Sequence, residues 1–153
     1  MVCPSTTGGI NWNSIGYSPQ TNALYAPTNN VCMDYYLNPV NPTVGGYHSS
    51  AVSRKISTPD EDSQIGIFSA VNVATGETLW AYKQRAAITG SVLTTGGGLA
   101  FVTDDARRFR AFDANNGQIL WEQILNSSAG GFPTTYSVDG VQYIAIAAGG
   151  GVS

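Results

Sequence analysis

The feature that most constrains the fold is a pattern that occurs twice, 41 residues apart. "AVNVATGETLW" runs from Ala70 to Trp80, and "AFDANNGQILW" runs from Ala111 to Trp121. Both stretches open with Ala, place Gly six residues later and close with Leu-Trp. A period near 40 residues is typical of solenoids and propellers, because a single repeat cannot bury its apolar face without neighbours.

The segments that flank this pattern repeat at the same interval. "GSVLTTGGGLAFVTD" begins at Gly90, and "GFPTTYSVDGVQYIAIAAG" begins at Gly131. Each is an apolar segment, a turn and an alternating strand, and the turns "TTGGG" and "SVDG" are typical of β-hairpins. One unit is therefore two consecutive hairpins, or four strands in about 40 residues, which describes a β-propeller blade.

The composition agrees with an all-β fold. Charged residues make up 11% of the chain, against roughly 25% in a typical soluble protein. Gly occurs 18 times and Tyr 8 times, which favours short strands and tight turns. No stretch combines helical periodicity with caps. We therefore predict an all-β chain of antiparallel blades.

The repeat predicts a partial β-propeller domain over residues 1–153, with about two and a half four-stranded blades. The blades are expected at about 8–85, at 87–126 and, in part, at 130–153. An insertion near 29–64, rich in Pro, Asn, Ser and Gly, predicts a long ordered loop in the first blade. Natural propellers have about four to eight blades. We therefore expect the C-terminal part of a larger propeller, with a signal peptide upstream.

Charge and cysteine content limit the possible functions. The net charge is −3 and the few basic residues are scattered, so no nucleic-acid partner is expected. The densest basic group, Arg107, Arg108 and Arg110, is expected to make ordinary surface contacts. Cys3 and Cys32 allow one pairing, but the sequence alone leaves open whether they form a disulfide or stay free.

Several stretches resemble the quinoprotein alcohol dehydrogenases, eight-bladed propellers that carry pyrroloquinoline quinone (PQQ) and calcium. The two repeated patterns resemble the tryptophan-docking motif of that family. "CPSTTGGINWNSIGYSPQTNALYAPTNNVC" resembles its segment that opens with Cys and runs through Gly-Gly-x-Asn-Trp. "TGSVLTTGGGLAFVTDDARRFRAFDANNGQILW" and "GGFPTTYSVDGVQYIAIAAGGG" resemble its last two blades. The resemblance covers nearly the whole chain except about 36–62.

The resemblance implies a structural role for the docking residues. In each motif the Gly offers a flat peptide and the Trp stacks between adjacent blades. A large buried ring supplies contact area there without a charge. The residues with this implied role are Gly76, Trp80, Gly117 and Trp121.

The resemblance also implies cofactor contacts. Asn11 matches an Asn that hydrogen-bonds the quinone, and an amide that donates and accepts suits such a ring; the alternative is an Asn in a turn. Trp12 is a second candidate, which would pack beneath Asn11, but a buried structural Trp is the favoured role. Thr89 occupies a position where many members have a Trp near the cofactor, so its hydroxyl is a candidate contact and a turn role the alternative. His48, the only histidine, has no neighbours that suggest metal binding, so we expect a structural or surface role.

Cys3 and Cys32 match positions that form a disulfide in the relatives. A bridge over a loop of about 30 residues would stabilise the fold by roughly 3–4 kcal/mol. It would also imply an oxidising compartment, which for this family is the periplasm. Free buried thiols remain the alternative.

The resemblance implies a periplasmic PQQ-dependent alcohol dehydrogenase. The catalytic base and the calcium ligands are expected upstream of this chain, so no catalytic or metal-binding residue is assigned and the chain alone is expected to be inactive. Expected partners are an alcohol substrate, a cytochrome c-type or quinone electron acceptor, and the remaining blades. The alternative is a non-catalytic propeller scaffold, like the outer-membrane assembly lipoproteins that share the docking repeat. Such scaffolds do not need the Gly-Gly-x-Asn-Trp segment or its flanking cysteines.

Overall fold

All the regular secondary structure in the described part of the chain is β-strand. The computed structural model describes residues 1–6, 8–47, 51–57 and 63–149. Within these ranges it has twelve strands and holds no helix that could cross a membrane. The prediction of an all-β chain of antiparallel sheets is confirmed.

The first blade is a four-stranded antiparallel sheet with the order β1-β2-β5-β6. Alternate side chains of β2 and β5 are buried, as expected for strands that present one face to a neighbouring blade. The strands are β1 (Gly16–Ser18), β2 (Ala23–Asn29), β5 (Gly66–Asn72) and β6 (Thr78–Gln84).

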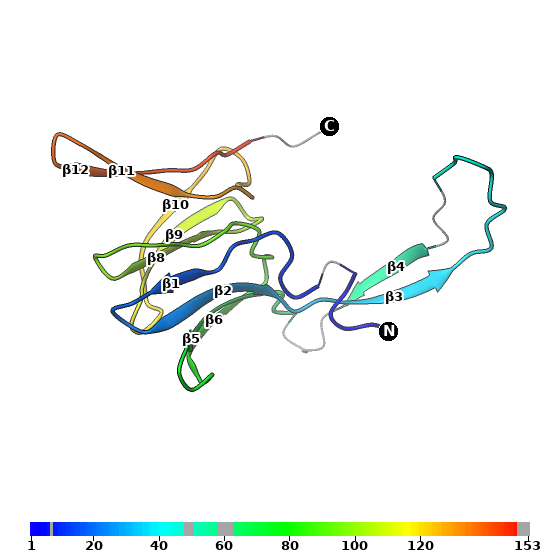
Figure 1. The fold of residues 1–153 in the computed structure, drawn as a ribbon, viewed down its shortest axis with the longest axis horizontal. Helices are drawn as coiled ribbons and strands as arrows, with labels where there is room; N and C mark the ends of the chain where they lie inside the picture. Colours follow the sequence, from blue (N-terminus) through cyan, green and yellow to red (C-terminus); the bar gives the residue numbers. More distant parts are fainter. Residues whose placement is uncertain (7, 48–50, 58–62, 150–153) are drawn as a thin grey trace.

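The second blade repeats this arrangement, and a hairpin follows it. The second sheet has the order β10-β9-β8-β7, and β11 and β12 form a two-stranded sheet. Figure 1 shows the first blade, the second blade and this hairpin lying one beside the next. The strands are β7 (Leu93–Thr94), β8 (Leu99–Thr103), β9 (Arg108–Asp113), β10 (Ile119–Ile124), β11 (Thr134–Val138) and β12 (Val141–Ala145).

The insertion in the first blade is a β-hairpin, so the prediction of a long loop is wrong. Strands β3 (Cys32–Leu37) and β4 (Ala51–Ser57) pair antiparallel and project from one end of the sheets (Figure 1). The aromatic residues of "CMDYYL" favour a strand. The Pro and Gly that suggested a loop are concentrated in the connection between the two strands, where turns need them.

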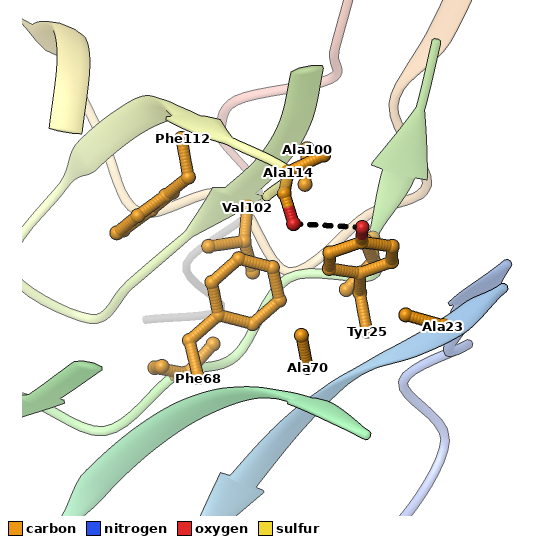
Figure 2. Close-up of a cluster of buried hydrophobic side chains, with 10 residues drawn as sticks. Ala23, Tyr25, Phe68, Ala70, Ala100, Val102, Phe112 and Ala114 are labelled. Carbon is orange, nitrogen blue, oxygen red and sulfur yellow. Dashed lines mark hydrogen bonds between the residues drawn. The ribbon is translucent and has the colours of Figure 1, made fainter. Parts of the chain in front are cut away.

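An aromatic core lies between the first and second blades. The Tyr25 hydroxyl donates a hydrogen bond to the Ala114 carbonyl at 2.9 Å, drawn as the dashed line in Figure 2. Burial raises the pKa of this phenol above its ordinary value. Phe68 and Phe112 meet edge to face with ring centroids 5.0 Å apart. The core consists of Ala23, Tyr25, Phe68, Ala70, Ile88, Val92, Ala100, Val102, Phe112 and Ala114.

Trp80 joins the two blades directly. Its indole Nε1 donates a hydrogen bond to the Ala114 carbonyl at 3.0 Å, and its ring lies parallel to that of Phe112. A Cβ added to Gly117 would lie 2.6 Å from Trp80 Cε3. Gly117 also has φ +73°, so both its turn and the ring above it require glycine.

The other two docking residues have no such partner in the described part of the chain. A Cβ added to Gly76 would meet nothing within 4 Å. The Trp121 side chain is 45% exposed and meets Phe109 edge to face. It borders an apolar cavity of about 400 Å³. This cavity is lined by Leu99, Phe101, Phe109, Ala111, Trp121 and Ile144.

Arg110 is buried, so the expectation of a surface contact is wrong for this residue. Arg110 is 5% exposed because residues on both faces of β9 are buried. Arg110 Nη1 lies 2.8 Å from Asp104 Oδ2, and Nε lies 2.5 Å from Glu122 Oε2. Burial alone would lower the pKa of Arg110, but the hydrogen bonds to Glu122 and Asp104 outweigh it and raise the pKa.

The docking contact predicts a difference between two Gly→Ala substitutions. Gly117→Ala and Gly140→Ala both place a Cβ at positive φ, which costs roughly 1–2 kcal/mol. Gly140 has open space around it, whereas Gly117 faces the Trp80 ring. We expect Gly117→Ala to lower the free energy of unfolding by about 1–3 kcal/mol more than Gly140→Ala. Urea denaturation measures this difference, and equal losses would contradict the docking role.

Candidate functional site

Two segments far apart in the sequence form the main walls of a cavity of about 230 Å³, to which Asn29 and Asp105 also contribute. One segment precedes β1, and the other connects β6 to β7. Asn11, Trp12 and Thr89, the three residues predicted to contact a cofactor, all line this cavity. The full lining is Gly8, Gly9, Asn11, Trp12, Asn13, Asn29, Ile88, Thr89 and Asp105.

The first wall is the segment that precedes β1. A disulfide and backbone hydrogen bonds hold its N-terminal end in place. Cys3 and Cys32 form a disulfide, which is the pairing that the resemblance implies. The Ser5 N–H donates to the Val31 carbonyl at 2.7 Å, and the Asn29 N–H donates to the Gly9 carbonyl at 2.7 Å. These bonds hold the "GGINW" segment beside the end of β2.

The second wall, residues 88–90, is held by side chains as well as by backbone. Asn29 exchanges two hydrogen bonds with the peptide groups of Ile88, both at 2.9 Å. Asn13 Nδ2 donates to the carbonyls of Thr89, at 2.5 Å, and Gly90, at 3.2 Å. The wall is therefore fixed by residues of the first blade.

Thr89 lines this cavity and carries an unsatisfied polar atom. Its Oγ1 is buried and has no hydrogen-bond partner among the described residues. A buried hydroxyl without a partner costs roughly 1–3 kcal/mol. Because Oγ1 has almost no accessible surface, other atoms of Thr89 form its part of the cavity wall.

Asn11 and Trp12 are both exposed. Trp12 is 59% exposed among the described residues, and both of its possible roles stay predictions. Neither side chain makes a hydrogen bond within the described ranges. Asn11 and Trp12 therefore bring an unused amide and an unused indole N–H to the residues that line this cavity, and both groups can donate to carbonyl or carboxylate oxygens.

Sequence reasoning missed Asn13, Asn29 and Asp105. Asn13 stands just after "GGINW" and Asn29 lies within "APTNN", and no local pattern marks either of them as a cavity residue. Asp105 follows the buried Asp104 and is exposed at the cavity. His48 lies outside the described residues. No cluster of three or more His, Cys, Asp or Glu able to hold a metal ion occurs in the described ranges.

The sheets thus form part of a β-propeller in which Asn11, Trp12 and Thr89 line one cavity. A family model described as "Glucose/ethanol/alcohol dehydrogenase, beta-propeller domain", of the PQQ type, matches residues 62–144. This is more than half of the chain, and the chain belongs to this family. Of the two readings of the sequence, this family corresponds to the quinoprotein dehydrogenase and not to the non-catalytic propeller scaffold.

Individual relatives match almost the whole chain. It is 35% identical over 151 residues to a 1-butanol dehydrogenase (quinone) of Thauera butanivorans, covering 99% of this chain and 24% of that protein. It is 32% identical over 152 residues to a lanthanide-dependent methanol dehydrogenase of Methylacidiphilum fumariolicum, covering 98% and 25%. The solved structure of a europium-containing methanol dehydrogenase superposes with a TM-score of 0.86 at 31% identity, covering 95% and 26%. The chain therefore spans about a quarter of the length of these relatives.

The disulfide yields a prediction about stability. Cys3 and Cys32 are 29 residues apart in sequence. Replacing both by Ser removes the restraint on the unfolded chain, so we expect the free energy of unfolding to fall by roughly 3–4 kcal/mol. Urea denaturation measures this loss. A reductant should destabilise the unaltered protein by a similar amount and leave the double variant unchanged; equal stability of the two oxidised proteins would contradict the prediction.

Proposed function

We propose that this chain forms part of the PQQ pocket of a quinoprotein alcohol dehydrogenase. The observation that carries this proposal is the convergence of Asn11, Trp12 and Thr89, from distant parts of the sequence, on one cavity. Membership of a PQQ dehydrogenase family supports the same assignment.

The residues present fit such a cofactor. The Asn11 amide and the Trp12 indole N–H are neutral donors that would bind quinone carbonyl and carboxylate oxygens. When bound, the quinone supplies the redox chemistry of alcohol oxidation. The part of this chain is to bind and orient the cofactor.

The names of the relatives suggest the substrate and the electron acceptor. They include a 1-butanol dehydrogenase (quinone) and a methanol dehydrogenase [cytochrome c] subunit 1 of Methylobacterium organophilum. We therefore propose a small alcohol as substrate and a quinone or a cytochrome c as acceptor. We place the protein in the periplasm, a location that the Cys3–Cys32 disulfide supports.

The metal that accompanies the cofactor is proposed to be calcium. The resemblance of the sequence motifs supports this ion, whereas the names of two relatives contain "lanthanide-dependent" and "europium-containing". Either ion would polarise the quinone. Its ligands are expected outside the described residues.

The proposal predicts cofactor-dependent activity. The protein expressed from its complete gene and loaded with PQQ should reduce an artificial dye in the presence of an alcohol. Calcium and europium, added separately, decide the metal. Absence of dye reduction and of PQQ binding with either ion would contradict the proposal and favour the scaffold alternative.

The 153-residue chain by itself should not oxidise alcohols. It supplies one side of the pocket, and Trp12 stays largely exposed there. PQQ-dependent dye reduction by the isolated chain, measured beside the complete protein under the same conditions, would contradict this expectation.

A further inference from the structure

The segment that precedes β1 is anchored on both sides of a short exposed stretch. On the N-terminal side, the Gly9 carbonyl accepts a hydrogen bond from the Asn29 N–H at 2.7 Å. On the C-terminal side, Asn13 Nδ2 donates to the Thr89 carbonyl at 2.5 Å. Residues 10–12 lie between these two anchors and are all exposed. We call residues 10–12 the bridge.

The bridge and its anchors form the first wall of the cavity. Five of the nine lining residues fall within six consecutive positions of the chain: Gly8, Gly9, Asn11, Trp12 and Asn13. The side chains of Asn11 and Trp12 make no hydrogen bond to the described part of the chain. How well the bridge is held in place therefore depends on its two anchors.

The Cys3–Cys32 disulfide joins the two stretches of chain that meet at the first anchor. Cys3 stands six residues before Gly9, and Cys32 stands three residues after Asn29. The S–S bond therefore closes a covalent link around the Asn29–Gly9 hydrogen bond. Asn29 and Gly9 line a hollow of about 390 Å³ beside Cys3, and both residues also line the cavity. The first anchor thus lies between the disulfide and the cavity.

A covalent link and a hydrogen bond restrain this wall differently. A backbone hydrogen bond opens and closes locally in a folded protein, so the Asn29–Gly9 bond alone would let the bridge move. The disulfide does not open in this way, and it keeps Gly9 within reach of Asn29. A ligand then meets a bridge that is already in place, and less of its affinity is lost to ordering the bridge.

We infer that the Cys3–Cys32 disulfide positions the bridge where Asn11 and Trp12 meet the ligand of the cavity. Cys3 and Cys32 are positioning residues, because they act through Gly9 and the bridge and do not line the cavity themselves. This inference rests on the proposed function, since it takes PQQ as the ligand. A disulfide that only stabilises the fold would leave the cofactor affinity of the folded protein unaltered.

Removal of the disulfide tests this role. The protein expressed from its complete gene is prepared without cofactor, as the unaltered form and as Cys3→Ala/Cys32→Ala. Alanine leaves no unpaired polar group at Cys32, which is fully buried. PQQ affinity is measured by quenching of tryptophan fluorescence, with calcium present and with both proteins folded. We expect the double variant to bind PQQ roughly three- to tenfold more weakly, because binding must then order the bridge.

Two inserted glycines give a second route if the double variant does not fold, since they keep the disulfide and loosen its connection to the bridge. Placed after Thr6, they interrupt the turn in which the Gly8 N–H donates to the Ser5 carbonyl at 2.8 Å. We expect a similar loss of PQQ affinity, roughly three- to tenfold. The matched control carries two glycines after Gly140, in the exposed turn between β11 and β12. Its PQQ affinity should equal that of the unaltered protein.

Hydrogen exchange tests the first anchor without any ligand. In the cofactor-free double variant, and in the Thr6 insertion, the Asn29 amide should exchange with deuterium roughly threefold faster or more. The reason is that its acceptor, the Gly9 carbonyl, is held less firmly. The Asp113 amide, which donates to the Gln118 carbonyl at 2.8 Å in the second blade, should keep its rate.

Unaltered PQQ affinity in the folded double variant or in the Thr6 insertion would overturn the inference and leave the proposed function standing. Unaltered exchange at Asn29 would do the same. An equal loss of affinity in the Gly140 control would trace the effect to general stability and would also overturn the inference. Failure of the unaltered protein to bind PQQ would overturn the proposed function, and this inference with it.

Discussion

The contact between the Trp80 ring and the Gly117 peptide sets the distance between the first two blades. The ring needs a flat partner, and the turn needs a residue at positive φ, so one glycine meets both demands. The Trp80 hydrogen bond to the Ala114 carbonyl then fixes the rotation of the ring. Because residues 88–90 run between these blades, the geometry of the cavity wall depends on this spacing.

A buried ion pair lies beside the same wall of the cavity. Arg110 and Asp104 are almost fully buried and form an ion pair at 2.8 Å. Gln84 bonds both of them, so no partner is left unpaired at a point where an isolated charge would be costly. Asp104 is adjacent to Asp105 of the cavity lining. The buried ion pair thus includes a residue directly beside the cavity lining in sequence.

The sequence predicts the blades well because a blade is local: its hairpins, turns and period all lie within about 40 residues. The β3–β4 hairpin was missed because the Pro and Gly of its connection dominated the composition of the whole insertion. Arg110 was misplaced because strand alternation cannot show that a second blade covers the other face. Asn13 and Asn29 were missed since their partners lie 59 or more residues away, and no local pattern marks such a bond.

Trp80 and Trp121 show how far a motif by itself can be interpreted. Their sequence contexts are nearly the same, yet Trp80 lies against a glycine turn while Trp121 is 45% exposed beside an apolar cavity. The difference comes from what faces each ring. The repeated motif therefore specifies a capacity for docking, which Trp80 shows by meeting the glycine of the next copy of the motif, Gly117. The segment "GGINW", which occurs once, differs in kind: its residues meet Thr89 at a cavity, and that meeting exists only because the docked blades bring residues 11 and 89 together.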